Sequence, residues 1–173
     1  MLKAKILLTV IMACLLLSCK SVKVDSADSY EIINSLTESD SNRKTKIYYK
    51  TIFAKYDGTQ IKELLKNYNL KFNLCSKSVY REKAKITENE INHLKEKFQY
   101  NTSKNLVFSK LENQSRFTKR KSESTVYISE PKKFRNGEYA IYYSEGRYGG
   151  QFNLLHKDKS EWQIVCSSTV WIE

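Results

Sequence analysis

The chain has 173 residues, of which 30 are Lys or Arg and 19 are Asp or Glu, so its formal net charge is +11. This length predicts one domain of ordinary size and argues against a second. Twenty-four of the basic residues are Lys and six are Arg. Because specific phosphate recognition favours the planar fork of Arg, the positive charge alone does not predict a nucleic-acid-binding protein.

A short apolar segment stands near the start of the chain. Lys3 and Lys5 precede an apolar run of 12 residues from Ile6 to Leu17. This run is too short to cross a hydrocarbon core, which needs about 20 residues. Its basic start and apolar centre are typical of a cleavable export signal.

The residues that end this run resemble the lipobox of bacterial lipoproteins, the motif at which their signals are cut. The matching residues are Leu16, Leu17, Ser18 and Cys19. The resemblance implies cleavage after Ser18 and attachment of acyl groups such as palmitate to Cys19. It also implies a protein of the bacterial cell envelope that this lipid anchor holds to a membrane, where we expect no nucleic-acid partner.

The lipoprotein interpretation divides the chain into three segments. Residues 1–18 are the signal peptide, residues 19–28 are a polar and disordered tether, and residues 29–173 form a single domain. Two lysines leave with the signal, so the mature chain keeps about +9 of the formal +11.

Helical patterns lie in the first half of the predicted domain. Apolar residues recur at helical spacing over residues 29–36 and again over residues 59–67. Thr87 and Glu90 form a capping-box sequence, which predicts that a third helix starts there. Residues 109–124 are polar and charged without a sustained period, so we expect a surface loop there.

Strands are predicted where β-branched and aromatic residues gather or alternate. These segments are residues 46–54, 70–74, 125–129, 138–144, 151–156, 161–166 and 169–172. Asn136 and Gly137 predict a type I′ hairpin turn, because both residues tolerate a positive φ. We therefore expect an α+β fold in which two or three N-terminal helices pack on a C-terminal antiparallel β-meander.

Two cysteines remain available once the signal and the lipid are accounted for. Cys14 leaves with the signal and Cys19 carries the lipid, so Cys75 and Cys166 are the thiols of the domain. In an oxidising envelope they can form one disulfide, and the alternative is two separate buried thiols. The spacing of the two residues leaves both alternatives open.

The chain contains none of the familiar sequence motifs of hydrolases, phosphate-binding loops, dinucleotide sites or zinc enzymes. We therefore expect no cofactor and no metal, and we assign no catalytic residue. Two kinds of catalysis stay formally open. One is a nucleophile pair that joins Cys75 or Cys166 to His93 or His156. The other is a carboxylate pair drawn from Glu88, Glu90, Glu130, Glu138 and Glu145.

The segment Ser144–Gly150 is the candidate binding loop. Arg147 and Tyr148 stand between glycines as recognition groups, and Gly149 and Gly150 follow them. The alternative interpretation is a hairpin connection in which the glycines only supply turn geometry.

The C-terminal strands resemble those of a group of small bacterial lipoproteins without an assigned activity. The resembling segments are Tyr127–Pro131, Glu138–Tyr143, Gly149–Gly150 and Trp162–Val165. The resemblance supports the expected fold and location and carries no activity with it. We expect a non-enzymatic binding module with a protein or glycan partner. The alternatives are a small envelope hydrolase and an inhibitor or immunity-type protein.

Overall fold

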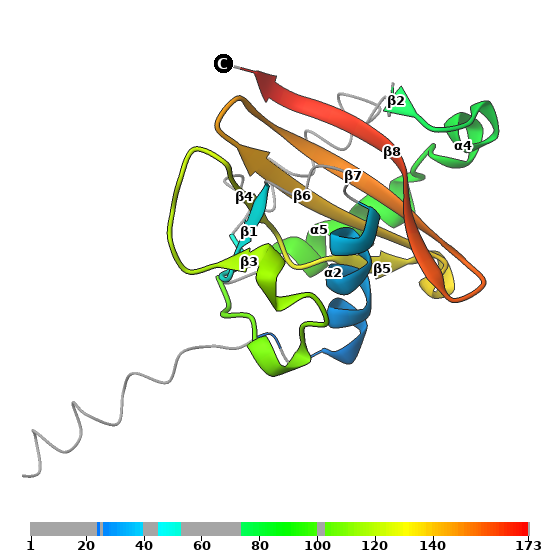
Figure 1. Ribbon diagram of the computed structural model, residues 1–173. Coiled ribbons are helices and arrows are strands. Elements are labelled where there is room, and N and C mark those ends of the chain that lie inside the picture. Colours follow the sequence, from blue (N-terminus) through cyan, green and yellow to red (C-terminus); the bar gives the residue numbers. More distant parts are fainter. Residues whose placement is uncertain (1–23, 25, 40–44, 53–73, 100–102, 173) are drawn as a thin grey trace, which may run out of the picture.

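The computed structural model describes residues 24, 26–39, 45–52, 74–99 and 103–172. Three α-helices of this described part precede the C-terminal strands (Figure 1). They are α2 (Ala27–Ser39), α4 (Ser78–Lys83) and α5 (Glu88–Gln99). The strands are β1 (Lys46–Tyr48), β2 (Leu74–Cys75), β3 (Phe117–Thr118), β4 (Thr125–Ile128), β5 (Lys132–Phe134), β6 (Tyr139–Gly146), β7 (Gly149–Asp158) and β8 (Glu161–Ile172).

The expected α+β class is confirmed, but the expected simple meander is wrong. The sheet has the order β2-β8-β7-β6-β4-β1-β3, with β5 paired to β6 as well. Strands β6, β7 and β8 do form an antiparallel meander. Strand β1, however, is parallel to both of its neighbours, β3 and β4. Parallel neighbours need long crossover connections, and the chain between β1 and β4 includes α4 and α5.

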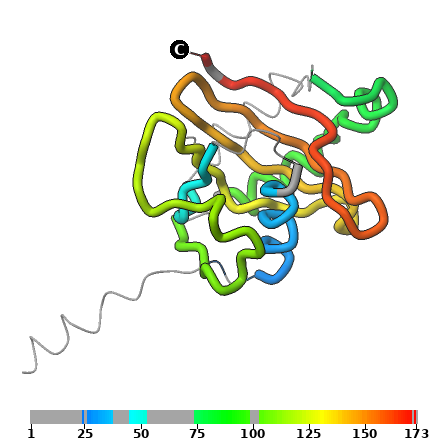
Figure 2. Tube along the Cα trace, in the orientation of Figure 1, coloured from blue at the N-terminus to red at the C-terminus, as the bar shows by residue number. Residues whose placement is uncertain are grey.

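The sheet is buried on both of its faces at β6. All six residues from Tyr139 to Ser144 are buried, and successive side chains point to opposite faces. Tyr139, Ile141 and Tyr143 pack in one hydrophobic cluster, whereas Ala140 and Tyr142 pack in another. In the chain trace of Figure 2, β6 runs through the middle of the sheet.

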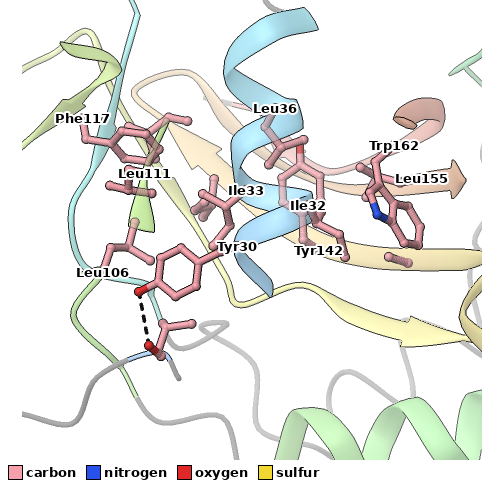
Figure 3. Packing of buried hydrophobic residues seen from close by; sticks show 14 residues of the cluster. Tyr30, Ile32, Ile33, Leu36, Leu106, Leu111, Phe117, Tyr142, Leu155 and Trp162 are labelled. Atoms are coloured by element: carbon pink, nitrogen blue, oxygen red, sulfur yellow. Dashed lines mark hydrogen bonds between the residues drawn. The ribbon is translucent and has the colours of Figure 1, made fainter. Parts of the chain in front are cut away.

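Helix α5 covers the first face and α2 covers the second. Ile91, Leu94 and Phe98 of α5 belong to the cluster that contains Tyr143. On the other face, Ile32, Ile33 and Leu36 of α2 pack beside Tyr142, Leu155 and Trp162 (Figure 3). The apolar pattern predicted over residues 29–36 is therefore confirmed, and the helix predicted to start at the capping box packs on the opposite face.

The polar segment that we expected to be a surface loop is partly buried. Leu111, Arg116 and Phe117 are all buried, and Phe117 begins β3 beside β1. Asn34 of α2 holds this segment, because its amide donates to the Lys110 carbonyl and its oxygen accepts from the backbone N–H of residue 112, each at 3.2 Å. Its contacts are with α2 and β1, which are distant in sequence. The absence of a local period therefore could not reveal that the segment is buried.

Other sequence predictions differ in their boundaries. Helix α2 starts two residues earlier than expected, and Val24 before it is already buried. Two predicted strands at the C-terminus are one strand, β8, which carries bulges at Val165 and Val170. Strand β5 and helix α4 were not expected. The predicted helix over residues 59–67 lies outside the described residues.

The capping box and the hairpin turn form as predicted, and Arg135 joins them. The Glu90 carboxylate accepts from the Thr87 backbone N–H at 2.7 Å. Asn136 and Gly137 have φ values of 54° and 87°, and the N–H of residue 138 donates to the Arg135 carbonyl at 3.0 Å. The Arg135 guanidinium reaches Glu90 at 2.5 Å and also donates to the carbonyls of Lys83 and residue 85. It thus ties the start of α5 to the β5–β6 hairpin.

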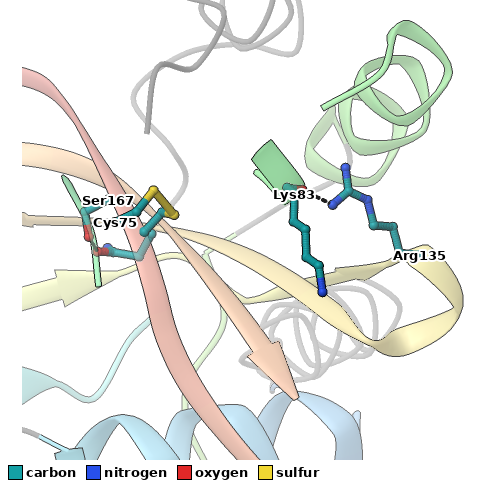
Figure 4. Close-up of a disulfide and its surroundings, with 6 residues drawn as sticks. Cys75, Lys83, Arg135 and Ser167 are labelled. Carbon is teal, nitrogen blue, oxygen red and sulfur yellow. Dashed lines mark hydrogen bonds between the residues drawn. A yellow bond between two sulfur atoms is a disulfide. The ribbon is translucent and has the colours of Figure 1, made fainter. Parts of the chain in front are cut away.

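Cys75 and Cys166 form a disulfide, which decides between the two alternatives left open by the sequence (Figure 4). The two residues stand directly opposite each other on β2 and β8, with their Cα atoms 4.0 Å apart. The bond closes a loop whose ends are 91 residues apart. A loop of this length contains α4, α5 and most of the sheet, so the bond restricts much of the unfolded chain.

We predict that this disulfide makes a large contribution to stability. Replacing both residues (C75S/C166S) should lower the free energy of unfolding by about 2–4 kcal/mol, because the unfolded chain regains conformational entropy. Urea unfolding with and without a thiol reductant measures this change. The reductant should weaken the wild-type chain and leave the double variant unchanged. Equal unfolding midpoints for the two chains without reductant would contradict the prediction.

Candidate functional site

A groove lies on the face of the sheet that α2 only partly covers. Its volume is about 650 Å³, within the range of ligand-binding clefts. It begins at the C-terminal half of α2 and extends to the tip of the β6–β7 hairpin. Its lining residues are Leu36, Thr45, Ile47, Val126, Ile128, Tyr142, Ser144, Glu145, Gly146, Tyr148, Gly149, Gly150, Gln151, Ile164, Thr169 and Ile172.

Exposed apolar side chains gather at this groove. Tyr148 is 69% exposed, Ile164 is 38% exposed and Ile172 is 78% exposed, and all three line the groove. Several solvent-exposed apolar side chains that lie together in one concave surface are typical of a binding site. The other large exposed hydrophobic residues of the described chain, Leu74 and Val79, lie outside the groove lining.

The floor of the groove borders a row of hydrogen-bonded polar side chains that crosses three strands. The Asn153 amide of β7 donates to the Ser144 hydroxyl of β6 at 2.8 Å, and the Ser167 hydroxyl of β8 donates to the Asn153 oxygen at 2.8 Å. The Gln151 amide donates to the same oxygen at 3.0 Å. This row fixes the Gln151 and Ser144 side chains at the groove, so the polar part of its surface is preorganised.

The described lining of the groove carries almost no charge. Glu145 is the single charged residue among the described lining residues. Its carboxylate accepts a hydrogen bond from the Tyr143 hydroxyl at 3.2 Å, and Tyr143 packs in the cluster on the opposite face of the sheet. A neutral groove in a chain with a formal charge of +11 is suited to a neutral, apolar ligand surface rather than to a polyanion.

Most of the predicted binding loop lies at the groove. Tyr148, Gly149 and Gly150 line it, whereas Arg147 pairs with Glu123 and holds its guanidinium 5.3 Å from the centre of the Tyr148 ring. Gly146 and Gly149 pair directly, so Arg147 and Tyr148 form a two-residue hairpin connection. The loop is therefore a hairpin tip that also forms part of a concave surface.

The structure removes one of the two catalytic alternatives. Both sulfurs of Cys75 and Cys166 are used in the disulfide, so neither is a thiolate that His93 or His156 could activate. His93 is exposed on α5, as its position off the apolar stripe predicts. The His156 ring instead packs 4.8 Å from the Tyr139 ring and 5.7 Å from the Tyr80 ring.

The carboxylates that the sequence offered as a catalytic pair lie at different places in the structure. Glu90 belongs to the capping box and binds Arg135, Glu88 and Glu138 are exposed, and Glu145 lies at the groove. Within the described ranges, no group of three or more His, Cys, Asp or Glu side chains could hold a metal ion.

Glu130 is the one carboxylate of the five considered from the sequence that the fold buries. It lies between β4 and β5 with its side chain only 5% exposed, and Lys104 and Lys132 bind it at 3.0 and 2.9 Å. Burial alone raises the pKa of this carboxyl, but the hydrogen bonds and charges of Lys132 and Lys104 outweigh burial and set the pKa below its usual value. Lys104 is far away in sequence, so no local signal reveals the cluster.

We predict that Glu130 stabilises the fold in a pH-dependent way. Because its pKa is lower in the folded state, its contribution is complete well above the unfolded value of 4.5 and is lost as the pH falls through the folded pKa. The variant E130Q should lose about 2 kcal/mol at neutral pH, since it leaves two lysine ammonium groups without their carboxylate. Urea unfolding at several pH values measures the difference from the wild type, which should shrink on acidification.

The variant E82Q is the matched control for this prediction. Glu82 also pairs with a lysine, at 2.7 Å, but both side chains are exposed. Its replacement should leave stability almost unchanged. A loss in E130Q that stays constant down to strongly acidic pH would contradict the assignment.

No α-helix of the described chain combines the length and the apolar character that a membrane span requires. Comparison of the chain with protein-family models, with curated proteins and with solved structures finds no match.

Proposed function

We propose that this chain is a lipoprotein of the bacterial envelope whose folded domain is a non-enzymatic binding module. Cys19 carries the lipid and holds the domain to a membrane, and the groove at the β6–β7 hairpin binds a second protein. The groove ligand is an uncharged, apolar segment of that protein. The single observation that carries this proposal is the presence of three exposed apolar side chains in one neutral groove.

The composition of the groove favours a protein partner over a glycan. Sugar rings stack on exposed aromatic faces, and Tyr148 is the one exposed aromatic residue in the part of the lining that the structure describes. The remaining apolar contacts come from aliphatic side chains such as Ile164 and Ile172, which match apolar side chains of a peptide. An enzymatic role has less support, since Glu145, the one carboxylate of the described lining, is hydrogen-bonded to a tyrosine hydroxyl and has no ion pair with a described residue.

We predict that the groove contacts its partner directly in living cells. A photo-crosslinking amino acid at Tyr148 or at Ile172 should give one discrete crosslinked protein, the same from both positions. The crosslinked peptide, identified by mass spectrometry, should be neutral and apolar. The same amino acid at Val79, which is 52% exposed outside the groove lining, is the control and should not capture this protein.

A charge in the groove should abolish this contact. The variant I164D should reduce the crosslink from position 148 at least about tenfold, because burying a large apolar side chain contributes about 1.5–3 kcal/mol. The matched variant V79D should leave it unchanged. If I164D fails to fold, Y148A with the crosslinker at position 172 replaces it. A crosslink to carbohydrate, or an equal yield in I164D and V79D, contradicts the proposal.

The lipid anchor makes a separate prediction. Whole-protein mass spectrometry of the native product should give a chain that begins at Cys19 and carries the added mass of acyl groups. The variant C19S should retain its signal segment and lose the acyl mass, because the thiol that accepts the lipid is gone. A native product that keeps Met1, or that begins at Cys19 without fatty acid, would contradict the assignment.

A further inference from the structure

A second cavity lies at the N-terminal end of α2, at the opposite end of that helix from the groove. Its volume is about 310 Å³, and its lining residues are Ser26, Asp28, Ser29, Ile32, Lys97, Glu130, Pro131, Lys132 and Lys133. Three of these residues are lysines, and a fourth, Lys104, binds Glu130 from beside the cavity. The site is therefore basic, in contrast to the neutral groove.

Among the described residues, the lysines at this cavity outnumber the carboxylates. Lys104 and Lys132 share one carboxylate, that of Glu130. The Lys97 ammonium donates to the Lys133 carbonyl at 2.6 Å, and it has no carboxylate within ion-pair distance among the described residues. Asp28 and Glu31 pair with Lys133, so four described lysines at the cavity stand against three described carboxylates, and Lys97 is the lysine without an ion pair among them.

Lys97 and Lys132 are close enough to affect each other. Burial and the repulsion from Lys132 both lower the pKa of the Lys97 ammonium. An anion bound between the two side chains would relieve this repulsion and supply the missing negative charge. The Lys133 ammonium is held by Asp28 at 3.0 Å and by Glu31 at 3.3 Å.

The start of the folded domain brings this cavity close to the lipid. Val24 is fully buried, its N–H donates to the Asn105 carbonyl at 3.0 Å, and its carbonyl accepts from the Tyr30 hydroxyl at 3.2 Å. The chain is therefore fixed to the domain five residues after Cys19. Five residues span at most about 18 Å in any conformation, and Ser26 at the rim of the cavity lies at most about 25 Å from Cys19.

We propose that the lysine cavity formed by Lys97, Lys132 and Lys133 binds the phosphate of an anionic phospholipid in the membrane to which Cys19 is attached. This inference rests on the proposed lipid anchor, because the short connection is what presents the cavity to the bilayer surface. Anionic lipids attract nearby lysines by about 1 kcal/mol each, so two or three of them fix the orientation of a domain that is already tethered. The groove at the other end of α2 then faces away from the membrane.

The test uses the full lipidated protein in vesicles of phosphatidylcholine alone or with one-third phosphatidylglycerol. Flotation first verifies that the protein is bound to both. Each vesicle sample is then treated briefly with an amine-acetylating reagent, and mass spectrometry gives the acetylation rate of each lysine. Acetylation of Lys97, Lys132 and Lys133 should be about fivefold slower or more in the anionic vesicles. Lys85 and Lys159, which are exposed on the α4–α5 connection and the β7–β8 turn, should react equally in both.

The variant K97Q isolates the cavity, because it removes one ammonium group and only one hydrogen bond, that to the Lys133 carbonyl. In K97Q the protection of Lys132 by anionic vesicles should fall by about fivefold, whereas K85Q should retain it. Equal rates in the two kinds of vesicle, or equal slowing at every lysine, would overturn the proposal. Protection of the cavity by inorganic phosphate in phosphatidylcholine vesicles, without anionic lipid, would assign a soluble phosphate ligand and overturn the lipid assignment.

Failure of the anchor itself gives a different result. A chain without acyl groups does not float with phosphatidylcholine vesicles, which contradicts the proposed lipidation. If that chain floats with the anionic vesicles and K97Q weakens this flotation, the lysine cavity is still supported. If it floats with neither kind of vesicle, the proposal for the lysine cavity is overturned. The groove proposal is tested independently by the crosslinks at Tyr148 and Ile172.

Discussion

The fold depends on the pairing of β6 with β7, which is buried on both faces. Eight residue pairs join these strands without a shift in register. A slip by one residue would exchange the side chains that face α5 with those that face α2, so both hydrophobic clusters fix the same register. The shifts in register lie in the next pair, β7 and β8, and place two bulges in β8. At one of them, Val165 and Cys166 are both in the hydrophobic cluster that contains α5. The disulfide then joins β8 to β2.

The position of α2 on this sheet creates both candidate sites. The helix extends from Ala27 to Ser39, and its apolar side chains cover only part of their face of the sheet. Beyond its C-terminal half, the sheet face stays open as the neutral groove. At its N-terminal end, Ser26, Asp28 and Ser29 form one wall of the lysine cavity. At a rise of about 1.5 Å per residue, the ten residues from Ser26 to Leu36 separate the two sites by roughly 15 Å.

This separation places a basic site at one end of α2 and an apolar site at the other, an arrangement that suits the proposed tethered binding module. The end of α2 with the lysine cavity is at most about 25 Å from the cysteine that we propose to carry the lipid, and the other end borders the exposed apolar side chains. The proposed contact with the bilayer and the proposed contact with a partner protein therefore involve different ends of one helix. The Glu130 carboxylate offsets the repulsion between Lys104 and Lys132, because it is buried between them.

The sequence by itself determined the elements whose signals are local. The capping box of Thr87 and Glu90, the positive-φ turn at Asn136 and Gly137 and the alternation of β6 all depend on neighbours within a few residues, so they could be predicted. Only the tertiary structure decided the parallel pairing of β1, the burial of Arg116 and the disulfide, since each joins distant segments. For the same reason the sequence could identify Tyr148, Gly149 and Gly150 as one loop but not the groove that they share with β8. The Lys104–Glu130–Lys132 cluster depends on long-range packing as well, because no local pattern records which side chains meet when the chain folds.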